Sequence, residues 1–221
     1  MTERRDVPEQ LRVKREPHRG VYDRATIDAI LDEALVCHLG FEVDGQPYVI
    51  PTLHARIGDR LYVHGSAASR MLRHAASELR VCVTITLLDG LVLARSAMHH
   101  SAQYRSVMLL GKARSIEDPA QKLAAFEAIV EHIVPGRWPD VRPPTANELK
   151  ATSLGAIPIE EASAKIRSGP PVDDEQDYAL ATWAGVIPMQ TRAGAPEPDP
   201  LLASGVEPPS YVSCYRRPGG P

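Results

Sequence analysis

The sequence predicts a mainly β protein with a few helices, built as a small barrel. Five to seven short segments are rich in β-branched and apolar residues, and only a few segments show helical periodicity. The pairs Asp44-Gly45 and Gly58-Asp59 mark tight turns between such segments. Short strands joined by tight turns fit a barrel better than a doubly wound parallel sheet, in which a helix follows each strand.

The chain has 221 residues, of which 43% are hydrophobic, enough to fill the core of one domain. Residues 1–20 are charged, punctuated by prolines and without apolar periodicity, so we expect an extended N-terminal arm. We expect the barrel domain in residues 21–190. Residues 191–221 form a proline-rich tail that we expect to be mostly irregular.

The charge and cysteine content exclude several classes of protein. The net charge of −3 lacks the basic excess of a nucleic-acid-binding protein. The N-terminus has no hydrophobic signal region, and no apolar run reaches the ~20 residues that span a bilayer. Three widely spaced cysteines without a CxxC pair favour a reduced protein. We therefore expect a cytoplasmic protein with neither membrane nor nucleic acid as a partner.

The first half of the chain predicts a helix, a three-stranded meander and a second helix. Asp23 is the expected N-cap of a helix over residues 24–36, which carries a stripe of apolar side chains. The segments around Asp44-Gly45 and Gly58-Asp59 then predict three consecutive strands. A short helix follows, and its expected buried face consists of Ala68, Met71, Leu72, Ala75 and Leu79.

The second half predicts two long strands, a helix and further strands. "RVCVTITLLDGLVLA" and "YRSVMLLGKARSIE" are β-rich, and "RSAMHHSAQ" connects them. Asp118-Pro119 opens a helix, whose expected apolar face contains Leu123, Phe126, Val130 and Ile133. "LGAIPIEEASAKIR" has strand-like content, and "TWAGVIPMQTRAG" predicts a last strand.

The stretch "YVHGSAASRML" predicts a place for an anion. It joins a strand to a helix, and the N–H groups of a helix N-terminus stabilise negative charge. Ser66 and Ser69 add hydroxyl donors, and Arg70 adds a cation. The alternative is a capped helix with solvated arginines. Neither a GxGxxG nor a Walker sequence is present, so neither a Rossmann site nor a P-loop is predicted.

Histidines are concentrated in the central part of the chain, at His54, His64, His74 and the pair His99-His100. Their spacing matches no metal-binding motif, and adjacent histidines on a strand point to opposite faces. We therefore predict no metal site and expect these imidazoles to be hydrogen-bonded at the barrel rim.

Several blocks in order resemble the flavin-nucleotide-binding branch of the pyridoxamine 5′-phosphate oxidase-like superfamily, which includes the nitroimidazole-resistance reductases. The blocks are "RGVYDRATIDAILDEALVCHLGFEVDGQPYVIPTLHARIGDRLYVHGSAASRML", "HHSAQYRSVMLLGKA" and "WAGVIP", and they span roughly residues 19–190. The resemblance implies a six-stranded split β-barrel, a homodimer with two equivalent sites at the subunit interface, and FMN as the cofactor.

The resemblance also implies roles for individual residues. It places the flavin phosphate on the segment "HGSAASRML". As the catalytic residue we predict His64, on the substrate side of the site. Arg105 and Ser106 of "YRSV" would reach the cofactor from a central strand, and Trp183 would cover it. The implied cofactor-binding residues are Pro51, Thr52, Gly65, Ser66, Ser69, Arg70, Arg105, Ser106 and Trp183.

The expected function is that of an FMN-dependent oxidoreductase, which passes electrons from a nicotinamide donor to a small electron-poor acceptor. Met71 stands where the oxidases proper have a second basic residue, which argues against oxidation of pyridoxamine phosphate. The alternatives are a non-catalytic flavin or haem carrier and a barrel that has lost its ligand. A deazaflavin in place of FMN also remains open.

Overall fold

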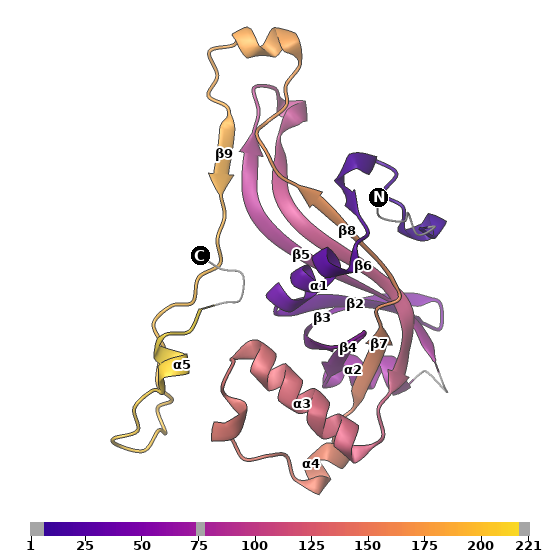
Figure 1. Cartoon of the computed structure of the whole chain (residues 1–221), viewed down its shortest axis with the longest axis vertical. Helices are drawn as coiled ribbons and strands as arrows, with labels where there is room; N and C mark the ends of the chain where they lie inside the picture. The colour runs from indigo at the N-terminus through magenta and orange to yellow at the C-terminus, as the bar shows by residue number, and fades with distance from the viewer. Residues whose placement is uncertain (1–6, 74–77, 217–221) are drawn as a thin grey trace.

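A computed structural model describes residues 7–73 and 78–216 of the chain (Figure 1). Six of its strands close into a ring of antiparallel neighbours, in the order β2-β3-β4-β7-β6-β5 and back to β2. This ring is the predicted six-stranded split β-barrel. The six strands are β2 (Val36–Val43), β3 (Gln46–Ile57), β4 (Arg60–His64), β5 (Leu79–Leu93), β6 (Ser101–Ser115) and β7 (Leu154–Pro158).

Three further strands extend the sheet beyond the ring. β8 (Glu161–Arg167) pairs with β6, β1 (Gly20–Val21) pairs with β8, and β9 (Gly185–Pro188) pairs with β5. The far ends of β5 and β6 project away from the ring, with β9 beside them (Figure 1). We call this projecting part, residues 88–104 and 168–189, the arm. It is distinct from the N-terminal segment, residues 1–20.

Five α-helices lie in the described residues: α1 (Arg24–Glu33), α2 (Ser66–Arg73), α3 (Pro119–Ile133), α4 (Ala146–Ala151) and α5 (Ser210–Ser213). The expected N-caps are confirmed. Asp23 accepts a hydrogen bond from the backbone N–H of Thr26 at 2.8 Å, and Asp118 accepts one from that of Gln121 at 2.8 Å. Five short 3₁₀ helices join the larger elements: η1 (Glu9–Leu11), η2 (Pro17–Arg19), η3 (Ala97–His99), η4 (Trp138–Asp140) and η5 (Glu175–Ala179).

The tight turns of the meander form as expected. Asp44 and Gly45, between β2 and β3, have φ angles of 51° and 79°, as a two-residue type I′ turn requires. Gly58, between β3 and β4, has a φ angle of 59°. These turns fix the register that places alternate strand residues in the barrel core.

The core fills the barrel and continues under α1 and α2. Its fully buried members include Leu31 of α1, Leu39 of β2 and Met71 of α2. Burial raises the pKa of the Cys37 thiol to about 12, so this cysteine is a packing residue and not a thiolate nucleophile.

Three expectations about helix boundaries and faces are corrected. Residues 34–36 leave the helix, because Ala34 is extended and Val36 begins β2. Leu79 does not extend the buried face of α2, because it begins β5, and Ala75 lies outside the described residues. In α3 the buried residues are Lys122, Ala125 and Ile129, whereas Leu123 is exposed. The Lys122 ammonium group is satisfied by the carbonyls of Leu149 and Thr152, each at 3.1 Å.

Both terminal segments contact the body of the protein. Leu11 of η1 is buried, and Gln10 donates a hydrogen bond to Glu161 at 3.0 Å. Near the other end, Tyr211 of α5 donates to Asp140, and Tyr215 donates to the carbonyl of Ile133 at 2.8 Å. Within residues 7–73 and 78–216, no helix is long and apolar enough to cross a membrane.

Candidate functional site

The turn between β4 and α2 is built around one glycine. Gly65 has a φ angle of +80°, a conformation that residues with a Cβ adopt at a cost. Its N–H donates to the carbonyl of Ser153 at 3.2 Å, and α2 begins at the next residue. The first N–H groups of a helix have no partner within it, and no acidic residue occupies the first turn of α2. This backbone therefore suits an anion.

Arg70 supplies a cation one helical turn further along α2. Its side chain is exposed, and its guanidinium lies over the Tyr48 ring, with the Cζ atom 5.6 Å from the ring centroid. Tyr48, on β3, in turn stacks on Phe41. The aromatic pair thus supports the guanidinium beside the turn. The predicted phosphate ligands Ser66 and Ser69 have side chains outside the described part of the structure.

His64 is the last residue of β4 and directly precedes Gly65. Its ring is half-buried and contacts the edge of Phe126 of α3, with ring centroids 5.7 Å apart. Its Nδ1 atom is buried and has no hydrogen-bond partner in the described structure. Burial lowers the pKa of His64, which favours the neutral imidazole.

The other predicted residues near this turn lie on β3. Pro51 is exposed and pairs with His38 of β2, whereas Thr52 is half-buried and donates through Oγ1 to the carbonyl of Leu53 at 3.3 Å. The fold thus places Pro51, Thr52 and the β4–α2 turn on the same part of the barrel, because β3 pairs with β4 and contacts α2.

Arg105 and Ser106 lie elsewhere, on the part of β6 that pairs with β5 and β8. Arg105 forms ion pairs with Glu33 of α1 and Asp89 of β5, the latter at 2.8 Å. Both carboxylates raise the pKa of Arg105. The Ser106 hydroxyl donates to the carbonyl of Lys165 at 3.1 Å. In the described chain these contacts join β6 to α1, β5 and β8, and not to β3 or α2.

Trp183 lies just before β9, on the arm, and 67% of its surface is exposed. Its ring covers Gly185, where an added Cβ would approach the indole to 2.9 Å. Within one chain, the predicted site residues therefore fall into two groups. One group lies at the β4–α2 turn and β3, and the other, Arg105, Ser106 and Trp183, lies on β6 and the arm.

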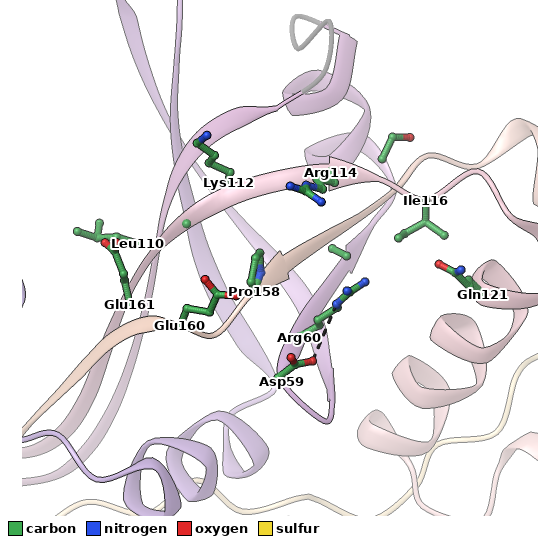
Figure 2. A pocket seen from close by; sticks show the side chains of 13 residues that line it. Asp59, Arg60, Leu110, Lys112, Arg114, Ile116, Gln121, Pro158, Glu160 and Glu161 are labelled. Atoms are coloured by element: carbon green, nitrogen blue, oxygen red, sulfur yellow. Dashed lines mark ion pairs between the residues drawn. The ribbon is translucent and has the colours of Figure 1, made fainter. Parts of the chain in front are cut away.

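A cavity of about 540 Å³ lies outside the ring where β4, β7 and β6 meet α3 (Figure 2). Figure 2 shows Lys112 and Arg114 on β6 and the pair Asp59 and Arg60 at the end of the β3–β4 hairpin. Lys112 and Arg114 share the Glu78 carboxylate, at 2.8 Å and 2.5 Å. Cations and carboxylates are mixed around this cavity, and the sequence predicted no role for its residues.

Another cavity, of about 590 Å³, lies between η2, β8, β6 and η3. Its lining combines histidines with several arginines and one lysine, including His18, His99, His100, Arg19, Lys165 and Arg167. Sequence reasoning placed the histidine pair at a rim but missed the arginines. The only signal for Arg167 was its place as the last residue of a strand-like segment, two residues after Lys165.

Asp173 and Asp177 offer carboxylate atoms within 4.8 Å of a His99 ring nitrogen, an arrangement that could hold a metal ion. However, Asp173 already accepts hydrogen bonds from the N–H and guanidinium of Arg95, at 2.9 Å and 3.0 Å. Its position is therefore explained by bonding within the arm, and we assign no metal to it.

Comparison with known proteins agrees with this architecture. Residues 23–166 match the family described as pyridoxamine 5′-phosphate oxidase, and this match covers all six strands of the ring. The chain belongs to the pyridoxamine 5′-phosphate oxidase family. None of the curated protein sequences matches the chain.

Two solved structures of proteins with related sequences share nearly the whole fold of this chain. The flavocytochrome Anf3 from Azotobacter vinelandii is 43% identical, with a TM-score of 0.88 over 95% of this chain and 97% of its own. The FAD and haem binding protein from Mycobacterium smegmatis is 35% identical, with a TM-score of 0.82 over 88% of this chain and 95% of its own.

A 5-nitroimidazole antibiotic resistance protein from Bacteroides thetaiotaomicron shares the fold at 24% identity. Its TM-score is 0.52, over 66% of this chain and 86% of its own. The similarity to the first two structures covers more of the chain than the family match over residues 23–166.

Proposed function

We propose that this chain is a flavin-dependent oxidoreductase that binds the phosphate of its flavin at the β4–α2 turn. The observation that carries the proposal is this turn, where a glycine with φ of +80° leads into a helix N-terminus beside Arg70. Free N–H groups and a guanidinium are the donors that a phosphate prefers. The predicted cofactor FMN remains our proposal for this site. FAD, named for the relative from M. smegmatis, contains the same phosphate and would use the same turn.

The flavin would carry the electrons, and the chain would bind and orient it. We propose His64 as the residue on the substrate side, because it adjoins the turn and its lowered pKa keeps a neutral ring available. A neutral imidazole can accept one proton near neutral pH and can donate a hydrogen bond through its N–H. A nicotinamide donor and a small electron-poor acceptor remain the proposed reaction partners.

A homodimer would bring the two groups of predicted residues together. The outer face of β2, β3 and β5 is uncharged at its centre, where His38 lies opposite Pro51 and Thr84, and Gly40 lies opposite Val49 and Cys82. Val49 is 68% exposed on this face. Such a face favours association with a second copy, whose β6 would supply Arg105 and Ser106 and whose arm would supply Trp183 to the first copy's turn.

The test is a calorimetric titration of the apoprotein with FMN and with FAD. Arg70→Ala is expected to weaken flavin binding by about 30-fold, or roughly 2 kcal/mol, because a charge-assisted contact is lost. Arg80→Ala removes an exposed arginine from β5 and serves as the matched control. Equal flavin affinity of the Arg70 variant and the wild type would overturn the phosphate assignment.

Haem binding beside the flavin is a second candidate function. Both relatives of high coverage are described with haem, one as a flavocytochrome and one as an FAD and haem binding protein. The observation in this chain that favours it is His100, which lines the cavity beside η3 and donates from Nδ1 to the carbonyl of Ser96 at 2.9 Å. In the neutral ring this bond leaves the lone pair on Nε2, as in histidines that ligate iron.

A further inference from the structure

The cavity between the N-terminal segment, β8 and η3 contains a buried arginine that no described carboxylate neutralises. The cavity measures about 590 Å³, which is within the range of pockets that hold small organic ligands. We call it the η2–β8 cavity. Four cationic side chains line it: Arg15, Arg19, Lys165 and Arg167.

Arg167, the last residue of β8, is only 8% exposed. Its one hydrogen bond to a described residue is a long one, from Nη1 to the carbonyl of Ala102 at 3.4 Å. A guanidinium carries several N–H donors, and most of those of Arg167 are unused within the described chain. A buried cation whose donors lack acceptors is unfavourable, so the site is incomplete without an anion.

Arg19 of η2 brings a second positive charge close to this guanidinium. Burial lowers the pKa of Arg167, and the charge of Arg19 lowers it further. Tyr104 and Glu16 act in the opposite direction without reversing the shift. Two cations that approach each other repel, and an anion between them replaces this repulsion with attraction.

The acidic residues on the lining are engaged elsewhere or exposed. Asp173 is bound to Arg95, and Glu16 lies 3.5 Å from Arg19. Asp174 is exposed. Within the described chain, none of these three carboxylates forms an ion pair with β8, so the positive charges of that strand remain available for a ligand.

The geometry of β8 places further donors beside Arg167. Lys165 precedes it by two residues, so both side chains point to the same face of the sheet. Tyr104 of β6 is the register partner of Arg167 and therefore shares that face. Both Lys165 and Tyr104 line the cavity. A guanidinium, an ammonium group and a phenol hydroxyl thus lie along one wall.

The lining indicates the chemical class of the ligand. Its apolar side chains, Met98 and Val172, are both exposed, and the others are polar or charged, so a hydrophilic ligand fits these walls. A phosphate group carries about two negative charges at neutral pH and accepts hydrogen bonds on several oxygens. Arginine matches this geometry with paired N–H donors. A carboxylate has one charge and two oxygens, so a phosphate suits several cations better.

We propose that the η2–β8 cavity binds a small hydrophilic molecule through a phosphate group, which pairs with Arg167 and is held further by Arg19 and Lys165. Arg167 would gain the counter-ion that the described chain does not supply. The cavity shares no lining residue with the β4–α2 turn. The proposal therefore concerns a separate site and does not depend on flavin or haem binding.

The first experiment is a calorimetric titration of the full chain with pyrophosphate and with succinate, a hydrophilic dicarboxylate. FMN is present in excess, so that pyrophosphate cannot occupy the proposed flavin site. The wild type is expected to bind pyrophosphate at least about tenfold more tightly than succinate. Absence of pyrophosphate binding, or equal affinity for the two anions, would overturn the proposal, and this comparison requires no variant to fold.

Substitutions on β8 test which residues bind the phosphate. Arg167→Met and Lys165→Gln are each expected to weaken pyrophosphate binding about tenfold, because a charge-assisted contact is lost. The Lys165 ammonium group forms no hydrogen bond or ion pair with a described residue, so Lys165→Gln should leave the fold intact. Arg60→Met, which removes an arginine from the other cavity, is the matched control and should bind as the wild type does. Unchanged affinity in both β8 variants would overturn the proposal.

A purely structural role for Arg167 predicts a different result. In that case Arg167→Met will lower the midpoint of thermal unfolding, and pyrophosphate will still raise the midpoint of the variant. If Arg167 binds the phosphate, pyrophosphate will raise the midpoint of the wild type but not that of the variant. The first pattern would overturn the proposal.

A last comparison separates this site from the proposed flavin site. Excess FAD in place of FMN should leave the pyrophosphate affinity unchanged. Loss of pyrophosphate binding in FAD would assign the cavity to the FAD diphosphate and overturn the proposal. A protein that binds neither flavin, but binds pyrophosphate through Arg167, would refute the proposed function and leave this inference intact.

Discussion

His54 of β3 and His132 of α3 lie with their ring centroids 5.3 Å apart, at the C-terminal end of α1. The Nε2 atom of His54 is 2.9 Å from the carbonyl of Leu31, and that of His132 is 2.7 Å from the carbonyl of Ala34. Both imidazoles therefore donate to carbonyls that a helix leaves unpaired at its end. His54 is fully buried, and its Nδ1 atom has no partner in the described structure.

This pair predicts that acid destabilises the protein in a defined range of pH. Burial, opposed by the bond to Leu31, lowers the pKa of His54 to about 4, against about 6.5 in the unfolded chain. The unfolded state thus binds a proton first, and the stability present above pH 6.5 is lost as the pH falls towards 4. Between pH 7 and pH 5 the free energy of unfolding should fall by about 2 kcal/mol.

The measurement is urea unfolding of the apoprotein at both pH values. His54→Gln removes one of the two buried imidazoles whose pKa is lowered and should reduce the pH dependence, to which His64 also contributes. His18→Gln, at an exposed position, should leave it as in the wild type. An undiminished dependence in the His54 variant would contradict this origin.

Arg105 is predicted to stabilise the fold by joining α1 to β5. Arg105→Met would remove the guanidinium that binds the carboxylates of both Glu33 and Asp89. We expect the free energy of unfolding of the apoprotein to fall by about 2 kcal/mol, because these groups are only partly exposed. Arg114→Met, which breaks an exposed pair with Glu78, should cost less than about 0.5 kcal/mol. Chemical denaturation measures both values, and an equal loss of unfolding free energy in the two variants would contradict this prediction.

Substitution of two turn glycines distinguishes the cost of backbone strain from the loss of cofactor binding at the β4–α2 turn. Gly65→Ala and Gly58→Ala both place a Cβ at a positive φ angle, and no atom in the described part of the chain lies within 4 Å of either added atom. Each should lower the free energy of unfolding by about 1 kcal/mol. Only Gly65→Ala should also weaken flavin binding, measured by quenching of flavin fluorescence. If Gly58→Ala weakens flavin binding to a similar extent, general destabilisation explains the effect and the role of Gly65 in phosphate binding is contradicted.

A charge introduced on the uncharged outer face of the barrel should disrupt the proposed dimer. Val49→Glu places a carboxylate at its centre and should shift a dimer to monomers in equilibrium sedimentation at micromolar concentration. Val206→Glu, at a 52% exposed position of the tail, should leave the assembly unchanged. A wild type that sediments as a monomer would contradict the shared site, and flavin binding by such a monomer would place the whole site within one chain.

The local elements of this protein follow from short-range sequence rules. Asp23 and Asp118 cap helices because a side-chain oxygen reaches an N–H three residues away. Asp44-Gly45 makes a hairpin because both residues tolerate positive φ angles. These interactions act within a few residues, so the sequence by itself determined α1, the meander and the start of α3. The closed six-stranded ring was predicted from the resemblance of several ordered sequence blocks to a known family.

Only the tertiary structure decided which residues meet across the chain. The face of α3 that packs inward contains Lys122, because two carbonyls near α4 satisfy its ammonium group. Leu79 changes from an expected helix residue to a strand residue because β5 begins there to pair with β6. Arg167 and His100 line one cavity although 66 residues of chain lie between them. Short-range patterns contain no information on such contacts, because burial and charge compensation depend on groups that the folded sheet brings together.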